Sequence, residues 1–117
     1  MSLPTKSFVL KIYIGESDRL EHMALYEALV KKARETGLAG ATVYRSPMGY
    51  GASSHIHSAK ILQLSLDLPI VIEIVEVEEK LRAFASEIGP LLNGALVTLA
   101  EVEVLHHSSK AAEITKD

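Results

Sequence analysis

The feature that most constrains the fold is a change in the spacing of apolar residues along the chain. Between Phe8 and Ile14 every second residue is large and apolar, the period of a strand with one buried face. From Leu25 to Ala33 the apolar residues recur at steps of three and four, the period of a helix with one buried face. Four more segments follow: strands at about 40–44 and 69–75, a helix at about 77–91 and a strand at 95–105. The predicted order is β-α-β-β-α-β.

This order predicts an α+β domain of the ferredoxin-like type, a sandwich in which two helices cover one face of a four-stranded antiparallel sheet. A single domain accounts for residues 1–117, with a core over about 7–105 and a polar C-terminal tail at 106–117. Asp18 and Glu21 resemble a capping box, so we expect the first helix to begin there. Gly37 suits the C′ position at its end.

The composition excludes several classes of function. The chain has no cysteine, which excludes disulfide scaffolds, thiol catalysis and cysteine-bound zinc. Its net charge of -3 provides no basic surface for nucleic acid. No targeting segment is visible and the first apolar run is too short to cross a bilayer, so we expect a cytoplasmic protein without membrane insertion. The sequence shows no nucleophile elbow, and we expect no enzymatic activity.

The sheet face that points away from the helices is predicted to be apolar. We expect the isoleucines to face the helices, together with Leu10, Val43, Ala100, Val102 and Val104. The face that points away then holds Val9, Tyr13, Tyr44, Val71, Val75, Val97 and Leu99, interrupted by Lys11, Glu73, Glu101 and Glu103. Because monomers rarely expose so much apolar surface, this face predicts self-association.

Most of the unusual residues lie in one long segment that begins “YRSPMGYGASSHIHS” at Tyr44. More than twenty residues separate Arg45 from Pro69, where a hairpin needs only two to five. Gly49, Tyr50 and Gly51 can turn backbone N–H groups toward an anion, and Arg45 can pair with a phosphate or carboxylate. A tight turn or bulge at the strand end explains the two glycines equally well.

The same segment contains a candidate metal site. His55 and His57 stand two residues apart, so in an extended segment they share a side and can ligate one divalent metal. Asp67, His106 or another subunit would have to supply a third ligand. Histidines in a polar loop are more often solvated or hydrogen-bonded, so we favour the anion site over the metal site.

Four stretches of the chain resemble a known family. They are “LKIYIGE”, “GLAGATVYRSPMGYG”, “SLDLPIVIEIVEVEEKLRAF” and “GALVTLAEVEV”, and they resemble the family called domain of unknown function 190, among the PII-like signalling proteins. The resemblance covers about residues 7–105 and is most specific at Thr-Val-Tyr-Arg…Gly-Tyr-Gly. It implies a ferredoxin-like homotrimer whose sheets pack toward the threefold axis, with a T-loop at about 46–68 that engages a partner protein.

The resemblance also implies a ligand site. PII binds adenine nucleotides in the cleft between subunits, and Gly49, Tyr50 and Gly51 match its T-loop base. The B-loop departs, since “IGPLLNGALV” has no Lys or Arg and Ala95 stands where PII has its phosphate-binding lysine. The tail “LHHSSKAAE” also lacks the arginines of PII.

These matches and departures together imply a non-enzymatic trimeric regulatory or sensor protein that binds a small anion, or a nucleotide weakly. Two alternatives remain open. One is a divalent-metal-binding trimer like the PII-shaped copper-tolerance proteins, using His55 and His57. The other is a structural trimer without a ligand.

Overall fold

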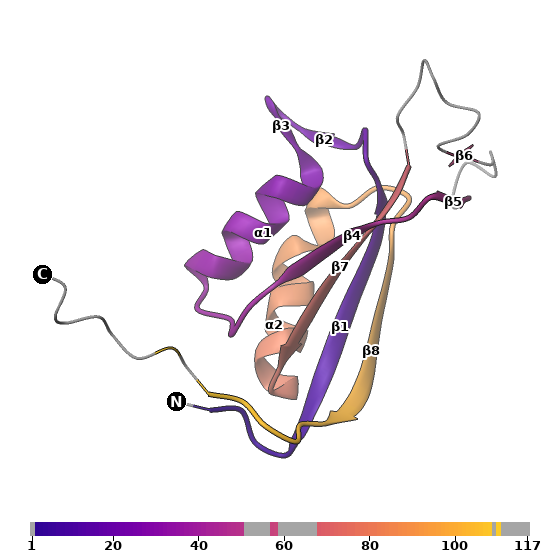
Figure 1. Ribbon diagram of the computed structural model, residues 1–117. Coiled ribbons are helices and arrows are strands. Elements are labelled where there is room, and N and C mark those ends of the chain that lie inside the picture. The colour runs from indigo at the N-terminus through magenta and orange to yellow at the C-terminus, as the bar shows by residue number, and fades with distance from the viewer. Residues whose placement is uncertain (1, 51–56, 59–67, 109, 111–117) are drawn as a thin grey trace, which may run out of the picture.

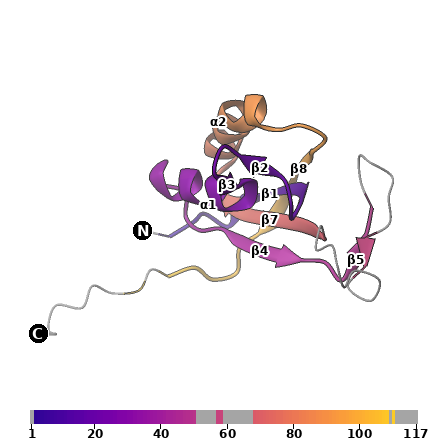
Figure 2. The same ribbon diagram turned by 90° about the horizontal axis from the view of Figure 1, so that it is seen from above.

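The centre of the protein is a four-stranded antiparallel sheet in the order β4-β7-β1-β8. The computed structural model describes residues 2–50, 57–58, 68–108 and 110. Both helices lie on the same side of the sheet (Figures 1 and 2). The four strands are β1 (Lys6–Gly15), β4 (Thr42–Arg45), β7 (Pro69–Glu76) and β8 (Leu96–Glu103), and the helices are α1 (Leu25–Glu35) and α2 (Glu78–Ile88). This arrangement confirms the predicted α+β fold.

Shorter elements lie between the main ones. A two-residue hairpin, β2 (Arg19–Leu20) with β3 (Met23–Ala24), precedes α1. A second small hairpin pairs β5 (Met48–Gly49) with β6 (His57–Ser58) beyond the end of β4. A 3₁₀ turn at Gly89–Leu91 follows α2. No helix within the described ranges has the length and apolar character that a membrane span requires.

The core forms where the alternating strands meet the apolar stripes of the two helices. β1 and β7 pair over eight residues and set Ile12 directly opposite Ile72, and both side chains are fully buried. Leu29 of α1 and Leu81 of α2 are also fully buried and belong to the same cluster. Burying a side chain of this size contributes about 1.5–3 kcal/mol. The strict alternation of the two central strands therefore determines which face the helices cover.

The first helix begins later than the sequence predicted. α1 starts at Leu25 after Ala24, which has no side chain that can cap it. The Asp18 carboxylate instead accepts a hydrogen bond from the backbone N–H of Gly15 at 3.0 Å, so it closes the turn after β1. Glu21 has φ +56° in the turn between β2 and β3. The capping-box prediction was wrong, whereas the prediction for Gly37, whose φ is +81°, is confirmed.

The register of β8 corrects the predicted faces of that strand. Leu99 lies opposite Leu10 and Val97 opposite Ile12, so both face the helices and pack against the core. Ala100 and Val102 lie opposite Val9 and Ser7 and face away, while Glu101 and Glu103 lie on the helix side. The predicted assignment of β8 side chains to the two faces was therefore wrong by one residue. Residues 95–105 have apolar side chains at both odd and even positions, so their period does not select a face.

The face that points away from the helices, the outer face, is consequently less charged than predicted. On the four strands it has two charged side chains, Lys11 and Glu73, whose Nζ and Oε2 atoms are 3.8 Å apart. The Tyr44 hydroxyl donates a hydrogen bond to Glu73 Oε1 at 2.9 Å. This bond and the negative charge of Glu73 raise the pKa of Tyr44. Around them lie Val9, Tyr13, Val71, Val75, Leu96, Ala100 and Val102.

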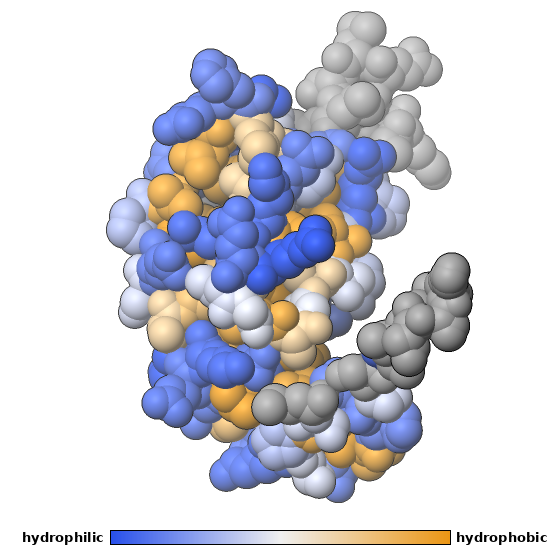
Figure 3. Space-filling view, turned by 90° about the vertical axis from the view of Figure 1, so that its left-hand side faces the viewer, coloured by the Kyte–Doolittle hydropathy of each residue, from blue (hydrophilic) through white to orange (hydrophobic). Residues whose placement is uncertain are grey.

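The side of the molecule that carries α1 differs from this face. There, hydrophobic residues form separate patches interrupted by hydrophilic ones (Figure 3). On the outer face, Tyr13, Tyr44 and Leu96 are exposed in the single chain.

Candidate functional site

The candidate site lies at the end of the sheet where β1 and β4 end and β7 begins (Figure 1). Gly15 lies opposite Pro69, and Arg45 lies opposite Ile70. Two backbone hydrogen bonds extend the pairing at this end, from Glu16 N–H to the Leu68 carbonyl and from Ser46 N–H to the Pro69 carbonyl, both at 2.8 Å. The predicted T-loop at 46–68 therefore leaves the sheet and returns to it beside the β1–β2 turn.

Arg45 forms an ion pair with Glu16 at this end of the sheet. Its Nη2 atom donates to Glu16 Oε2. The Arg45 side chain is 58% exposed, whereas that of Glu16 is only 15% exposed. An exposed, permanently charged guanidinium is thus held by a largely buried carboxylate. The sequence identified Arg45 but not its partner.

Glu16 was missed because the sequence alone does not place it near Arg45. It follows the glycine that ends β1, and 29 positions separate the two residues in the chain. They meet because β1 and β4 both pair with β7, on either side of it. A carboxylate directly after β1 and an arginine at the end of β4 would have signalled the pair only once that strand order was known.

The second oxygen of Glu16, Oε1, is buried. Among the described residues, no group donates a hydrogen bond to Oε1, although this atom is buried. Buried polar atoms are nearly always hydrogen-bonded, since leaving one unpaired is costly. The site therefore has an unused acceptor next to a permanently charged donor group.

Gly49 is explained by close packing. The φ angle of Gly49 is not positive, so a left-handed backbone conformation does not explain the glycine. A Cβ atom at this position would lie 3.0 Å from Cγ of Pro69, which is tighter than an ordinary contact. Ser46 supports the same turn, because its hydroxyl donates to the Met48 carbonyl at 2.7 Å. The base of the T-loop is thus folded tightly over the first residue of β7.

The remaining predicted anion-site residues are Tyr50 and Gly51. Tyr50 is 68% exposed and follows directly after the β5 strand. Its ring is accessible to a ligand or to a second subunit. Gly51 lies outside the described residues.

The predicted metal ligands are only partly placed. His55 lies outside the described residues, and for His57 the structure gives the backbone, which pairs with Gly49. Within the described ranges, no three His, Asp or Glu side chains gather closely enough to hold a metal ion. His106 follows β8 at the far end of β1, a ten-residue strand that spans about 30 Å. His106 and the backbone of His57 therefore lie toward opposite ends of the sheet.

The segment that corresponds to the B-loop lies at the same end of the sheet as Arg45. β8 begins at Leu96, opposite Tyr13 near the end of β1, so residues 92–95 precede it there. Gly94 has φ +75° and turns the chain into β8. Because this segment has no Lys or Arg, Arg45 is left without a second cation from the B-loop.

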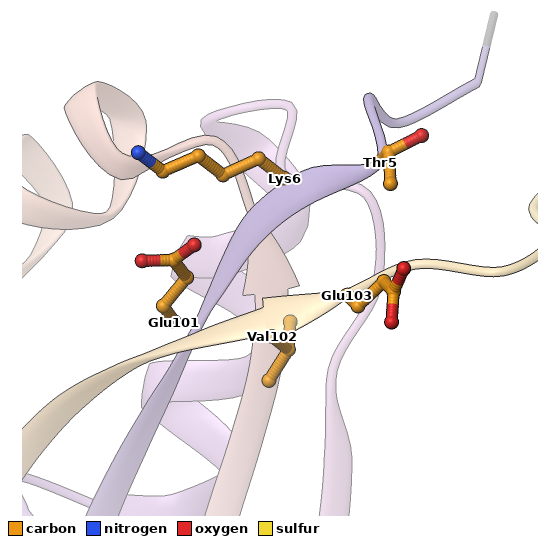
Figure 4. Close-up of a pocket in the computed structure, with 5 residues that line it drawn as sticks. All are labelled: Thr5, Lys6, Glu101, Val102 and Glu103. Atoms are coloured by element: carbon orange, nitrogen blue, oxygen red, sulfur yellow. The ribbon is translucent and has the colours of Figure 1, made fainter.

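A shallow hollow is found at the opposite end of the sheet. Thr5, Lys6, Glu101, Val102 and Glu103 line it (Figure 4). Its two carboxylates outnumber its one ammonium group, so it does not suit an anion. It lies apart from the predicted site residues.

Comparison with solved structures places this fold among PII-like proteins. CPII, a nitrogen regulatory PII-like protein from Thiomonas intermedia K12, superposes with a TM-score of 0.65 at 16% sequence identity. The match covers 85% of this chain and 88% of CPII, in a structure bound to ADP, AMP and bicarbonate. A second CPII structure, bound to ADP and bicarbonate, gives a TM-score of 0.63 at 17% identity.

Sequence relatives show the family. A UPF0166 protein of Aquifex aeolicus is 42% identical over 101 residues, which cover 86% of this chain and 95% of that protein. A UPF0166 protein of Methanocaldococcus jannaschii is 32% identical over 100 residues, which cover 85% of this chain and 92% of that protein. Residues 7–104 match the family DUF190, described as “Uncharacterized ACR”. Since this match spans nearly the whole described core, the chain belongs to the DUF190 family.

Proposed function

We propose that this protein is a PII-like regulatory or sensor protein that binds a small anionic ligand at the base of its T-loop. The observation that carries this proposal is the position of Arg45, which presents an exposed guanidinium where the T-loop leaves the sheet. CPII has the same fold and is bound to ADP, AMP and bicarbonate, which supports a ligand of anionic character. The proposed role is regulatory rather than enzymatic.

The charges at the site favour a small anion over a nucleoside triphosphate. Arg45 can make a bidentate contact with a carboxylate, carbonate or phosphate group. Glu16 already neutralises part of its charge, and residues 92–95 add no second cation. Each missing charge-assisted contact weakens binding by about 1.5–3 kcal/mol, or one to two decades of affinity. A nucleotide is therefore expected to bind weakly through its phosphates.

We also propose that the working form is a cytoplasmic homotrimer. Among the described residues of its four strands, the outer face has one ion pair and many apolar side chains, so burial against other copies would stabilise it. In this trimer the T-loop base of one subunit and the B-loop segment of its neighbour would form the ligand cleft. The T-loop itself would engage a partner protein.

Calorimetric titration tests the proposal. The wild-type protein is titrated with bicarbonate, phosphate, AMP, ADP and ATP, and Arg45→Ala is expected to weaken binding by about ten- to a hundredfold. The matched control is Arg82→Ala, because Arg82 is also exposed and paired with a glutamate, Glu78, but lies on α2. The control should bind as the wild type does.

Two results would overturn the anion site. One is the absence of binding by any of these anions, and the other is equal binding by wild type and Arg45→Ala. The double variant His55→Ala, His57→Ala separates the metal alternative. If a divalent metal binds to the wild type but not to the double variant, and no anion binds, the metal-binding trimer replaces our proposal.

A further inference from the structure

The fold of the described residues does not explain Oε1 of Glu16, a buried oxygen that accepts no hydrogen bond from any of them. We infer that Glu16 determines the specificity of the anion site, selecting anions that carry a hydrogen-bond donor over anions that carry only acceptors. This inference rests on the proposed function, since it concerns the ligand of the same site. It identifies Glu16 as the discriminating residue and Arg45 as the attracting one.

The geometry places both groups next to one ligand. Oε2 of Glu16 contacts Arg45 Nη2, and Oε1 belongs to the same carboxylate. An anion that contacts the guanidinium therefore lies beside the carboxylate, and it would reach the buried Oε1 once the Arg45 side chain turns aside. Because the Arg45 side chain is more than half exposed, it can move aside or rotate to admit the ligand.

The ionised Glu16 carboxylate distinguishes the two kinds of anion by its hydrogen-bonding capacity. An ionised carboxylate only accepts hydrogen bonds, so an anion oxygen without a proton is repelled by it. An anion with an O–H group can instead donate to Glu16 while its other oxygens accept from Arg45. Such a ligand also satisfies the buried Oε1 atom, which has no donor among the described residues.

Two pairs of simple anions differ in just this property. Bicarbonate and nitrate are both planar monoanions, but only bicarbonate has an O–H group. Monohydrogen phosphate and sulfate are both tetrahedral dianions, but only the phosphate has an O–H group. Within each pair, shape and charge are matched and the donor is the main difference.

The experiment compares these pairs by calorimetric titration at constant ionic strength and mildly alkaline pH. The wild-type protein is expected to bind bicarbonate over nitrate, and phosphate over sulfate, by about tenfold. In Glu16→Gln the amide can offer either its oxygen or its NH₂ group, so both preferences should fall to about twofold or less. This variant should also bind nitrate and sulfate more tightly than the wild type does.

Glu78→Gln is the matched control, because Glu78 is likewise paired with an arginine but lies on α2. It should keep both preferences. Equal wild-type binding within each pair, or an unchanged preference in Glu16→Gln, would overturn the role of Glu16 and leave the anion site standing. If no anion binds the wild type, the proposed function fails and this inference fails with it. If Glu16→Gln does not fold, the wild-type ratios alone decide.

Discussion

At the scale of single residues, the base of the T-loop depends on the missing side chain of Gly49. A Cβ atom there would lie 3.0 Å from Pro69, whose backbone is fixed by pairing with Gly15. Gly49→Ala should therefore destabilise the protein by about 1–2 kcal/mol in chemical denaturation. Gly40→Ala is the control, because its Cβ would meet no atom within 4 Å, and it should be neutral or slightly stabilising. Equal stability of the two variants would contradict the close packing.

Glu76 is a second residue on which the local structure depends. It is 4% exposed, and its two carboxylate oxygens accept hydrogen bonds from the backbone N–H groups of Ala39 and Val77 at 2.8 and 3.0 Å. It thereby ties the connection before β4 to the start of α2. Glu76→Ala should cost about 2–4 kcal/mol, because both donors lose a charged acceptor. The exposed Glu35→Ala should change the free energy of unfolding by less than about 0.5 kcal/mol.

The residues of the candidate site were only partly predictable from the sequence. Arg45 and Gly49 stood out because their chemistry is unusual at a strand end. Glu16 did not, since its significance comes from the strand order that brings it beside Arg45. A spatial partner distant in sequence has no local signal.

At the scale of elements, the register of β8 makes a prediction for neighbouring positions. Leu99 packs against the core and Ala100 faces away. Leu99→Asp should unfold the protein or cost more than about 3 kcal/mol, because it buries an unpaired charge. Ala100→Asp should leave the fold of the single chain intact. Circular dichroism and chemical denaturation of both variants distinguish this register from one shifted by a residue, which would reverse the two results.

The errors made from the sequence at this scale also have a physical cause. Strict alternation determined the faces of β1 and β7, where Ile12 and Ile72 are opposite each other. In β8 the apolar residues do not alternate strictly with polar ones. Its pairing with β1 therefore decides which of its side chains point toward the helices. The start of α1 was misplaced because the Asp18 carboxylate bonds locally to the Gly15 N–H and does not cap the helix, which begins at Leu25. Local propensity cannot distinguish these two uses of one carboxylate.

At the scale of the whole molecule, the outer face predicts the oligomeric state. We expect a trimeric mass by light scattering that does not change on dilution through the micromolar range, because obligate interfaces are large and apolar. Ala100→Asp places a charge on this face and should lower the mass to that of a folded monomer. A monomeric mass for the wild type would refute the proposed assembly.

The fold as a whole was the most predictable level. The alternation between strand and helix periods determined the order of the six main elements, and that order left few topologies. The conformation of the T-loop was not predictable, since its apolar residues follow no single period.

The two ends of the domain lie side by side. The Val104 N–H donates to the Thr5 carbonyl at 2.7 Å, and Leu3 N–H donates to Nδ1 of His107 at 2.9 Å. Both ends lie at the opposite end of the sheet from β5 and from the end of β4 (Figure 1). A circular permutant, in which a short linker joins these ends and the chain is reopened at the Asn93–Gly94 turn, would keep every strand pairing of the sheet. The new termini would then lie at the same end of the sheet as Arg45, next to the opposite edge strand, where a fluorophore could report ligand binding at the candidate site.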